Sequence, residues 1–330
     1  HKFTSYLTTI DSDGCIVKQA NIKNVDYNFL QYFSDLSGEH QTTVESTCTW
    51  YWLNDLLASI NIPLTLAHAK YVKAIAYAKV KTDKVDSHIL AQLLRLNFIP
   101  QAHKISNENR TLRDALRARL KIVPRCTSVT NSMALVLAKY NLTEPEGLQN
   151  IPKLQYEQLS DHASLLKEQM LTLEKSLYPY LIPNEDIQRL LWIPGIGKMN
   201  AFTIVLEADD INRFADVKNF FSYCRLVPSA RNSAGKSKQR SSKDGSRYLK
   251  IVFTDAATHA VQYYSEIRKY HNSLLRKKSK QIAKTIIAKE IAEIVFYRLK
   301  NKTNFNNKFK GVELQHKKSL QWPRVVSPDV

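Results

Sequence analysis

The sequence predicts an α/β domain at the start of the chain, followed by long helices and a mainly helical, basic C-terminal part. Three observations carry this prediction. Short strand patterns alternate with a helical pattern over roughly the first hundred residues, which is typical of a layered α/β sheet. From about residue 107 the apolar spacing becomes that of long helices. Residues 231–330 hold 23 Lys and Arg against 7 Asp and Glu, a net charge of +16.

The composition is that of a soluble globular protein with room for two domains. The chain has 330 residues, a net charge of +18 and no run near the ~18 uncharged apolar residues that a membrane helix needs. We therefore expect no membrane partner. The four cysteines lie far apart, which fits neither a disulfide framework nor a zinc site and favours a reducing cytoplasm. The chain begins His1-Lys2-Phe3, which we expect to be the start of a fragment.

Four patterns define the N-terminal domain. Residues 3–17 predict a β-hairpin, because extended patterns flank the turn Asp11-Ser12-Asp13-Gly14. Residues 42–45 predict a strand that ends at Glu45, and an apolar-spaced helix follows over 52–60. Residues 63–66 predict another strand. We expect these strands to share one sheet.

Long helices follow the N-terminal domain. Helical patterns on either side of a loop at 141–152 predict an antiparallel hairpin, which would serve as a spacer or an oligomerisation arm. Pro124 predicts a kink in its first helix. Residues 282–299 predict an amphipathic helix, and the Asn- and Lys-rich sequence after Asn301 predicts poor order.

Three carboxylates are candidates for a metal site. Glu45 ends a predicted strand, and Lys81-Thr82-Asp83-Lys84-Val85-Asp86 predicts the start of a helix. Asp83 and Asp86 then share one face of its first turn. Carboxylates from a strand end and a helix start suit one or two Mg²⁺ ions, which would polarise a scissile phosphate. Helix capping produces the same pair of aspartates, so the spacing leaves both interpretations open.

The stretch from Pro228 to Lys243 carries several serines among cations. A serine in a flexible, Arg- and Lys-rich loop could attack phosphorus, while the cations stabilise the charge that builds on the phosphoryl oxygens. The alternative is a basic loop that only touches backbone phosphates, and the residues alone favour that alternative.

A glycine turn, Ile193-Pro194-Gly195-Ile196-Gly197-Lys198, precedes another helical pattern. Such a turn exposes backbone N–H groups that hold phosphates without regard to base identity, as in helix-hairpin-helix DNA binding. A plain turn between packed helices is the alternative. The charge of residues 231–330 predicts a polyanion partner, and a solvated basic tail is the alternative.

Several motifs together resemble the DEDD transposases of the insertion-sequence "IS one-ten" family, whose recombinases are guided by a bridge RNA. The resemblance covers residues 1 to about 300 and rests on Val44-Glu45-Ser46-Thr47, Lys81 to Asp86, Ile193 to Gly197, Leu226-Val227-Pro228, Ser233-Ala234-Gly235-Lys236 and Lys243-Asp244-Gly245. Several motifs that agree in order are more specific than any one of them.

The resemblance implies an RNase H-type, Holliday-junction-resolvase-like domain that holds Mg²⁺, a helical connector, and a C-terminal transposase domain that supplies a serine nucleophile. Glu45, Asp83 and Asp86 match the last three of the family's four acidic positions, and Ser233 best matches the serine. The serine would form a covalent phosphoserine link to DNA and exchange strands through a junction-like intermediate. The link conserves the phosphoester, so no external energy source is needed.

The chain departs from the family pattern at four places. The family's first acidic residue precedes a His-Lys or Ser-Lys pair, so we expect that aspartate to lie before His1. Ala234 follows the candidate serine where the family usually has glycine, which leaves Asn232 and Ser237 close enough to be alternatives for the matched position. Ser246 stands where an asparagine is common, and Pro124 lies in a helix that is normally continuous.

We expect a metal-binding domain over residues 1–104, a helical connector over 105–186, a transposase domain over 187–300 and a basic tail over 301–330. The predicted protein is a bacterial cytoplasmic, RNA-guided, Mg²⁺-dependent DNA transposase that acts as a dimer or tetramer on element ends and a target. A junction-resolving nuclease without a covalent intermediate and a non-catalytic nucleic-acid-binding protein are the alternatives. Nucleic-acid contacts are expected from Gly195, Gly197, Lys198, Arg231, Lys236, Lys238, Arg240 and Lys243.

Overall fold

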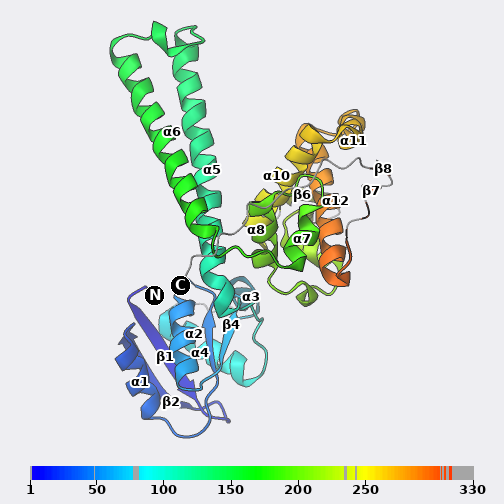
Figure 1. Ribbon diagram of the computed structural model, residues 1–330. Coiled ribbons are helices and arrows are strands. Elements are labelled where there is room, and N and C mark those ends of the chain that lie inside the picture. The colour runs from blue at the N-terminus through cyan, green and yellow to red at the C-terminus, as the bar shows by residue number, and fades with distance from the viewer. Residues whose placement is uncertain are drawn as a thin grey trace, which may run out of the picture. The chain divides into compact units, whose positions relative to one another are not determined.

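The computed structural model divides the chain into two compact units, residues 1–104 and 105–330, drawn in one colour sequence in Figure 1. The structure describes residues 2–47, 49–76, 82–233, 236–241, 244–304, 306, 308–309 and 312–313, with the backbone alone at 229–233, 236–241 and 312–313. Within these residues, no helix combines the length and the apolar character that a membrane crossing requires.

The first unit opens with the predicted hairpin, which is confirmed. β1 (Thr4–Ile10) pairs antiparallel with β2 (Ile16–Lys23). The Asp11 carboxylate closes the turn by accepting hydrogen bonds from the backbone N–H groups of Asp13 and Cys15, at 3.0 and 2.8 Å. The aspartates of this motif are therefore turn residues.

The predicted strands at 42–45 and 63–66 are also confirmed, and they pair in parallel. A helix joins them, as a parallel connection requires. The remaining elements of the unit, in chain order, are α1 (Asp26–Ser34), β3 (Thr42–Glu45), α2 (Trp50–Ser59), β4 (Leu64–Ala67), α3 (Ala69–Ile75) and α4 (Asp83–Arg95).

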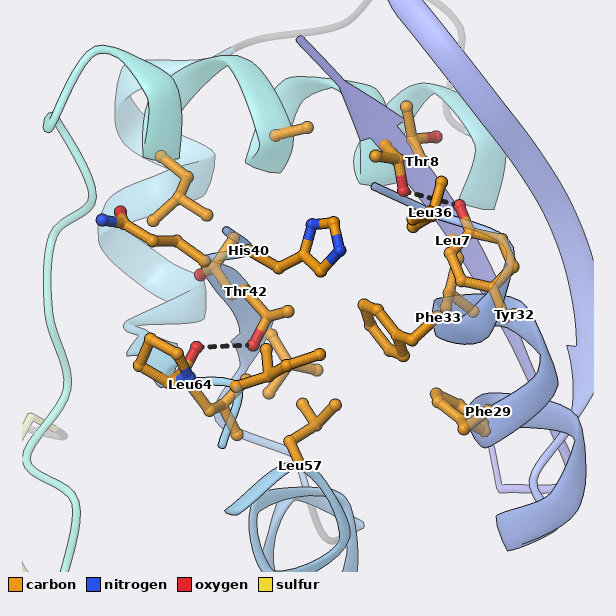
Figure 2. A pocket seen from close by; sticks show the side chains of 18 of the residues that line it. Leu7, Thr8, Phe29, Tyr32, Phe33, Leu36, His40, Thr42, Leu57 and Leu64 are labelled. Atoms are coloured by element: carbon orange, nitrogen blue, oxygen red, sulfur yellow. Dashed lines mark hydrogen bonds between the residues drawn. The ribbon is translucent and has the colours of Figure 1, made fainter. Parts of the chain in front are cut away.

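The strands of this unit differ from the prediction of one shared sheet. Among the described residues, β1–β2 and β3–β4 form separate two-stranded sheets, and a cavity of about 1220 Å³ lies between β1 and β3. Figure 2 shows its apolar lining, with Phe29 and Phe33 of α1, Leu57 of α2 and Leu64 of β4. α4 packs against both β1 and β3. Burial of apolar side chains, rather than a hydrogen-bonded ladder, therefore joins the two pairs.

The second unit opens with the predicted antiparallel helical hairpin, which is confirmed. α5 (Asn107–Lys139) and α6 (Asn150–Leu177) pack through an apolar seam that includes Val129 and Leu166. Pro124 lies inside α5 without ending it. Buried side chains on both sides of the proline pack against neighbouring helices, which holds the helix together despite one missing backbone donor.

In the described part of the second unit, six further helices surround one apolar core. The ring of Phe220 contacts those of Phe253 and Phe296, with centroids 6.1 and 5.7 Å apart. The helix predicted over 282–299 is confirmed as the last of the six, and it buries Ile287, Ile291 and Val295 among other apolar side chains, although Ile282 and Tyr297 are exposed. The six are α7 (Glu185–Leu191), α8 (Lys198–Ala208), α9 (Val217–Tyr223), α10 (Arg247–Tyr263), α11 (Ser265–Leu275) and α12 (Lys280–Asn301), with short 3₁₀ turns at Pro145–Gly147 and Ile211–Arg213.

The serine stretch is not the flexible loop that its composition predicts, so that prediction is wrong. β5 (Pro228–Ser233) and β6 (Lys236–Ser241) form an antiparallel hairpin in which Ser233 pairs with Lys236. The backbone groups of both strands satisfy one another in this ladder. The strand signal was hidden because polar and charged residues occupy nearly every position, so no apolar alternation marks it.

The basic tail is ordered in part, which corrects the prediction of poor order after Asn301. β7 (Lys308–Phe309) pairs with β8 (Val312–Glu313), and Phe309 is buried in the helical core. One aromatic side chain therefore anchors this stretch. Residues 314–330 lie outside the described residues.

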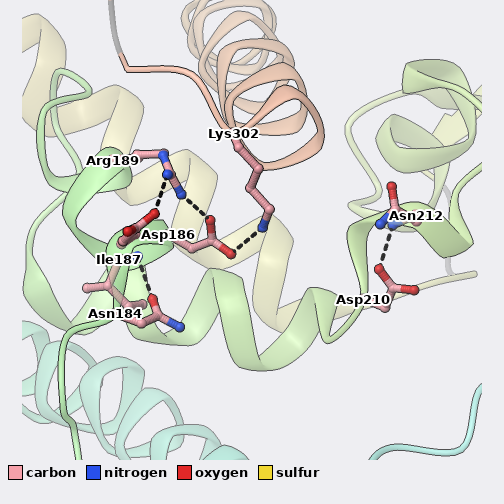
Figure 3. A network of polar contacts seen from close by, with 8 residues as sticks. Asn184, Asp186, Ile187, Arg189, Asp210, Asn212 and Lys302 are labelled. Atoms are coloured by element: carbon pink, nitrogen blue, oxygen red, sulfur yellow. Dashed lines mark hydrogen bonds and ion pairs between the residues drawn. The ribbon is translucent and has the colours of Figure 1, made fainter.

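A polar network fixes the start of α7 against the end of α12 (Figure 3). The Asn184 side chain caps α7 by accepting a hydrogen bond from the Ile187 N–H at 2.9 Å. The Asp186 carboxylate accepts from Arg189 at 2.8 Å and from Lys302 at 2.7 Å. Because α7 leads into the glycine turn, this network orients the turn as well.

Candidate functional site

The three candidate carboxylates stand at the ends of their elements. Glu45 is the last residue of β3 and is half-buried, whereas Asp83 is the first residue of α4 and is exposed. The Thr82 hydroxyl, not Asp83, caps α4 by accepting from the Val85 N–H at 3.2 Å. Helix capping therefore does not account for Asp83, although an acidic residue in a first turn still favours the helix dipole.

The donor chemistry suits Mg²⁺, but the site is not a complete protein cage. Among the described residues, no three His, Cys, Asp or Glu side chains gather closely enough to hold a metal ion. Mg²⁺ is commonly held by one or two carboxylates together with water and substrate phosphates. An ion held jointly by one or two of these carboxylates and a nucleic-acid phosphate stays a prediction.

The glycine turn between α7 and α8 has a packing role at its first glycine. Gly195 has a φ of +82°, and a Cβ atom there would lie 2.0 Å from the carbonyl oxygen of Ala256 in α10. Only glycine allows this approach of the turn to α10. Gly197 is exposed at the N-cap of α8, and a Cβ atom there would meet open space. Phosphate contact therefore stays a prediction for Gly197 and Lys198.

The base of the serine hairpin is tightly held. The Ser246 N–H donates to the Tyr223 carbonyl at 2.7 Å, and the Arg225 side chain donates to the Gly245 carbonyl at 2.8 Å. A Cβ atom at Gly245 would lie 2.2 Å from the Tyr223 carbonyl oxygen. The chain segments that enter and leave the hairpin therefore lie against one another at a fixed place.

A buried carboxylate connects this base to the long helix α5. Glu207 of α8 is 1% exposed, accepts a hydrogen bond from the Ser246 hydroxyl at 2.9 Å and forms a two-pronged ion pair with Arg117 of α5. Burial of Arg117 opposes its charge, but Glu207 outweighs burial and raises the pKa of the guanidinium above its ordinary value. We name Arg117, Glu207 and Ser246 the buried triad.

The contact between Glu207 and Arg117 is not visible in the sequence. They lie 90 residues apart, and neither belongs to a recognisable motif. The one available signal is a glutamate within the mostly apolar second half of α8, because a buried charge needs a partner.

The glycine turn and the serine hairpin lie at opposite ends of α8. Gly195 packs against Ala256 and Ala260 in the later part of α10, whereas Ser246 caps the start of α10 beside Glu207 near the end of α8. α8 and α10 are thus antiparallel. The length of α8, 11 residues, separates the two features by about 16 Å.

The remaining predicted contacts fall on the hairpin. The backbone pairs Arg231 with Lys238 and places Arg240 opposite Ser229, which puts cations along both strands. Lys243 lies outside the described residues.

Two family models match separate parts of the chain. One, a transposase model of the DEDD type for IS110, matches residues 1–142, and the other, "Transposase IS116/IS110/IS902 family", matches residues 187–272. The first contains all three candidate carboxylates, and the second contains the glycine turn, the serine hairpin and two members of the buried triad.

The chain belongs to the IS110 family of transposases.

The curated proteins that the chain resembles are also named as transposases. The chain is 25% identical over 240 residues to the "Transposase for insertion sequence element IS1328" of Yersinia enterocolitica, covering 66% of this chain and 72% of that protein. It is 22% identical over 280 residues to the "Probable family 20 transposase" of Pseudomonas aeruginosa, covering 77% and 81%. It is 23% identical to the "Transposase for insertion sequence element IS1111A" of Coxiella burnetii, covering 56% of each chain. The resemblance drawn from the motifs is confirmed at the level of the family.

The two glycines of the turn should respond differently to alanine in this IS110-family protein. Gly195→Ala places a methyl group against the α10 backbone at a positive φ, so it should lower the free energy of unfolding by at least about 2 kcal/mol. Gly197→Ala has open space and should cost less than about 1 kcal/mol. Denaturant unfolding of the two variants measures this difference. Equal losses would contradict the close approach to α10.

Breaking the buried triad from one side should be costly. Arg117→Met leaves the Glu207 carboxylate buried without its cation and should lower the free energy of unfolding by about 3 kcal/mol or more. The double variant Arg117→Met with Glu207→Leu removes both charges and should recover much of that loss. Chemical denaturation measures both variants. A single variant as stable as the parent would show that the pair is not a structural tie.

Proposed function

We propose that the chain cuts and rejoins DNA strands through Ser233, presented on the β5–β6 hairpin. The observation that supports this most is a cation-rich, serine-bearing hairpin whose base is held to a buried ion pair. A loop that merely touched phosphates would not need such an anchored base. Membership of the IS110 family supports DNA as the substrate.

The proposed step exchanges one phosphoester for another. The Ser233 Oγ loses its proton and forms a bond to phosphorus, while the bond from phosphorus to one sugar oxygen breaks and that oxygen takes up a proton. A sugar hydroxyl from another strand then attacks the phosphoserine and releases the serine. The cations along the hairpin stabilise the charge on the phosphoryl oxygens during both steps.

Of Glu45, Asp83 and Asp86, one or two would hold Mg²⁺ together with a substrate phosphate, and the bound ion would polarise a phosphate oxygen. Asp83 is exposed at the start of α4 and is available to an ion that a nucleic acid brings with it. Glu45 is half-buried at the end of β3, so an ion would reach its carboxylate only from the exposed side.

The proposal also includes a guide RNA and a second copy of the chain. The resemblance to bridge-RNA-guided recombinases supports the first. The long α5–α6 hairpin supports the second, because it exposes apolar side chains such as Leu135, Ile151 and Leu154.

Ser233→Ala should abolish the covalent protein–DNA adduct. The test uses the chain with its guide RNA and a nicked duplex that carries the element end, followed by denaturing electrophoresis. Ser237→Ala and Ser241→Ala are the matched controls, because they remove hydroxyls from the same hairpin, and both should retain the adduct. An adduct that survives in Ser233→Ala and disappears in a control variant would overturn the assignment.

Asp83→Asn should separate cleavage from binding. Removing a carboxylate that holds an ion should slow Mg²⁺-dependent cleavage by about 10- to 100-fold. DNA affinity should stay within about twofold, because binding depends on the basic C-terminal part. Asp13→Asn, an exposed position in the β1–β2 turn, is the control. If both variants cleave at the parent rate, Asp83 does not serve the reaction.

A further inference from the structure

The turn between α11 and α12 concentrates positive charge. Between Glu266 and Glu290 the sequence holds eight Lys and Arg residues and no acidic residue. Half of these cations lie where α11 ends and α12 begins (Figure 1). We name these four the basic turn: Arg276, Lys277, Lys278 and Lys280.

The charge of the basic turn is not neutralised by the protein. All four side chains are exposed, and within the described part of the chain none forms an ion pair or a side-chain hydrogen bond. Other cations of the same unit are engaged: Lys302 pairs with Asp186, and Arg117 pairs with Glu207. Unlike Lys302 and Arg117, the cations of the basic turn are therefore free to bind an external anion.

The backbone holds these cations at defined positions. The N–H groups of Lys277 and Lys278 donate to the Leu274 carbonyl at 3.1 and 2.9 Å, which closes the end of α11. The Ser279 hydroxyl caps α12 by accepting from the Ile282 N–H at 3.4 Å. Both helices are packed into the apolar core, so the charges stand on an ordered turn rather than on a loose tail.

The chemistry of the turn selects a polyanion. Unit charges about 6 Å apart repel by roughly 0.7 kcal/mol in water, and the fold keeps four such charges together without a compensating acid. A strand of phosphates relieves this repulsion and releases counterions. Lys side chains act as point charges and read no base pattern, so the contact carries no sequence preference.

We propose that the basic turn is a contact for the phosphate backbone of duplex DNA, separate from the glycine turn and the serine hairpin. The proposal rests on DNA as the substrate in the proposed function, but not on the serine mechanism. Binding without cleavage tests it, so its failure is distinguishable from failure of the recombinase chemistry.

The experiment measures the affinity of the full chain for a duplex of arbitrary sequence at several salt concentrations. The parent and a variant with Arg276→Gln, Lys277→Gln, Lys278→Gln and Lys280→Gln are compared. If all four cations contact phosphates, the slope of log affinity against log salt should become shallower by about 3 to 4. The affinity at 0.1 M salt should fall by roughly a thousandfold. The variant should fold as the parent does, because Ser279 still caps α12. Thermal melting followed by circular dichroism checks this.

Two controls define the site. Lys139→Gln, Lys153→Gln, Lys167→Gln and Lys175→Gln together remove the same charge from exposed positions on α5 and α6, and this variant should keep most of the parent slope. A variant that exchanges Lys for Arg and Arg for Lys within the basic turn keeps all four charges, so it should show the parent's slope of log affinity against log salt. An equal loss in the α5–α6 variant, or an unchanged slope in the basic-turn variant, would overturn the proposal. Binding to phosphatidylserine vesicles is measured for the same variants. If the basic-turn variant loses vesicle binding but keeps DNA binding, the turn serves a membrane surface and the proposal is overturned.

Discussion

The buried carboxylate of Glu207 is the interaction on which the second unit depends. It is 1% exposed at the mostly apolar end of α8, where an unpaired charge would be costly, and it is satisfied from two sides by Arg117 and Ser246. Arg117 lies on the long helix that opens the unit, and Ser246 begins the helix that follows the serine hairpin. The requirement to satisfy one charge therefore fixes three helices relative to one another at the base of the hairpin. Tyr223 and Gly245 complete that base through a backbone contact too close for any side chain larger than hydrogen.

This arrangement separates the two places in the second unit for which we propose nucleic-acid contact. The start of α8 presents the glycine turn, and its far end supports the hairpin, with the helix acting as a spacer of about 16 Å. The basic turn after α11 lies on another part of the same fold. A rigid body that holds several phosphate contacts at set distances can position a strand while a nucleophile acts on one phosphate, and this is the requirement of a strand-exchange reaction. The spacing follows from helix packing and does not depend on any base-specific contact.

The elements with regular apolar spacing were predictable from the sequence, and the features that depend on tertiary pairing were not. The β1–β2 hairpin, the strands expected over 42–45 and 63–66, and the antiparallel α5–α6 pair follow from local periodicity and turn residues. The β5–β6 hairpin was missed because cations and serines replace apolar alternation, and only the partner strand makes it a strand. The separation of the four N-terminal strands into two pairs could not be read from strand patterns, since periodicity gives the face of a strand and not its neighbour. Gly195 was singled out for phosphate binding, yet its φ and its contact with Ala256 explain the glycine by packing. The family was predictable because its motifs recur in order, whereas Glu207 and Arg117, 90 residues apart, became visible only as a contact.

Mass spectrometry of the trapped complex determines whether the DNA strand is carried on the hairpin serine. The chain is incubated with its guide RNA and DNA, quenched, and digested with nuclease and protease. The account predicts one peptide that carries the mass of a nucleotide on Ser233. A nucleotide on a tyrosine, on another serine or on no peptide, from a reaction that has cut its DNA, would contradict the account.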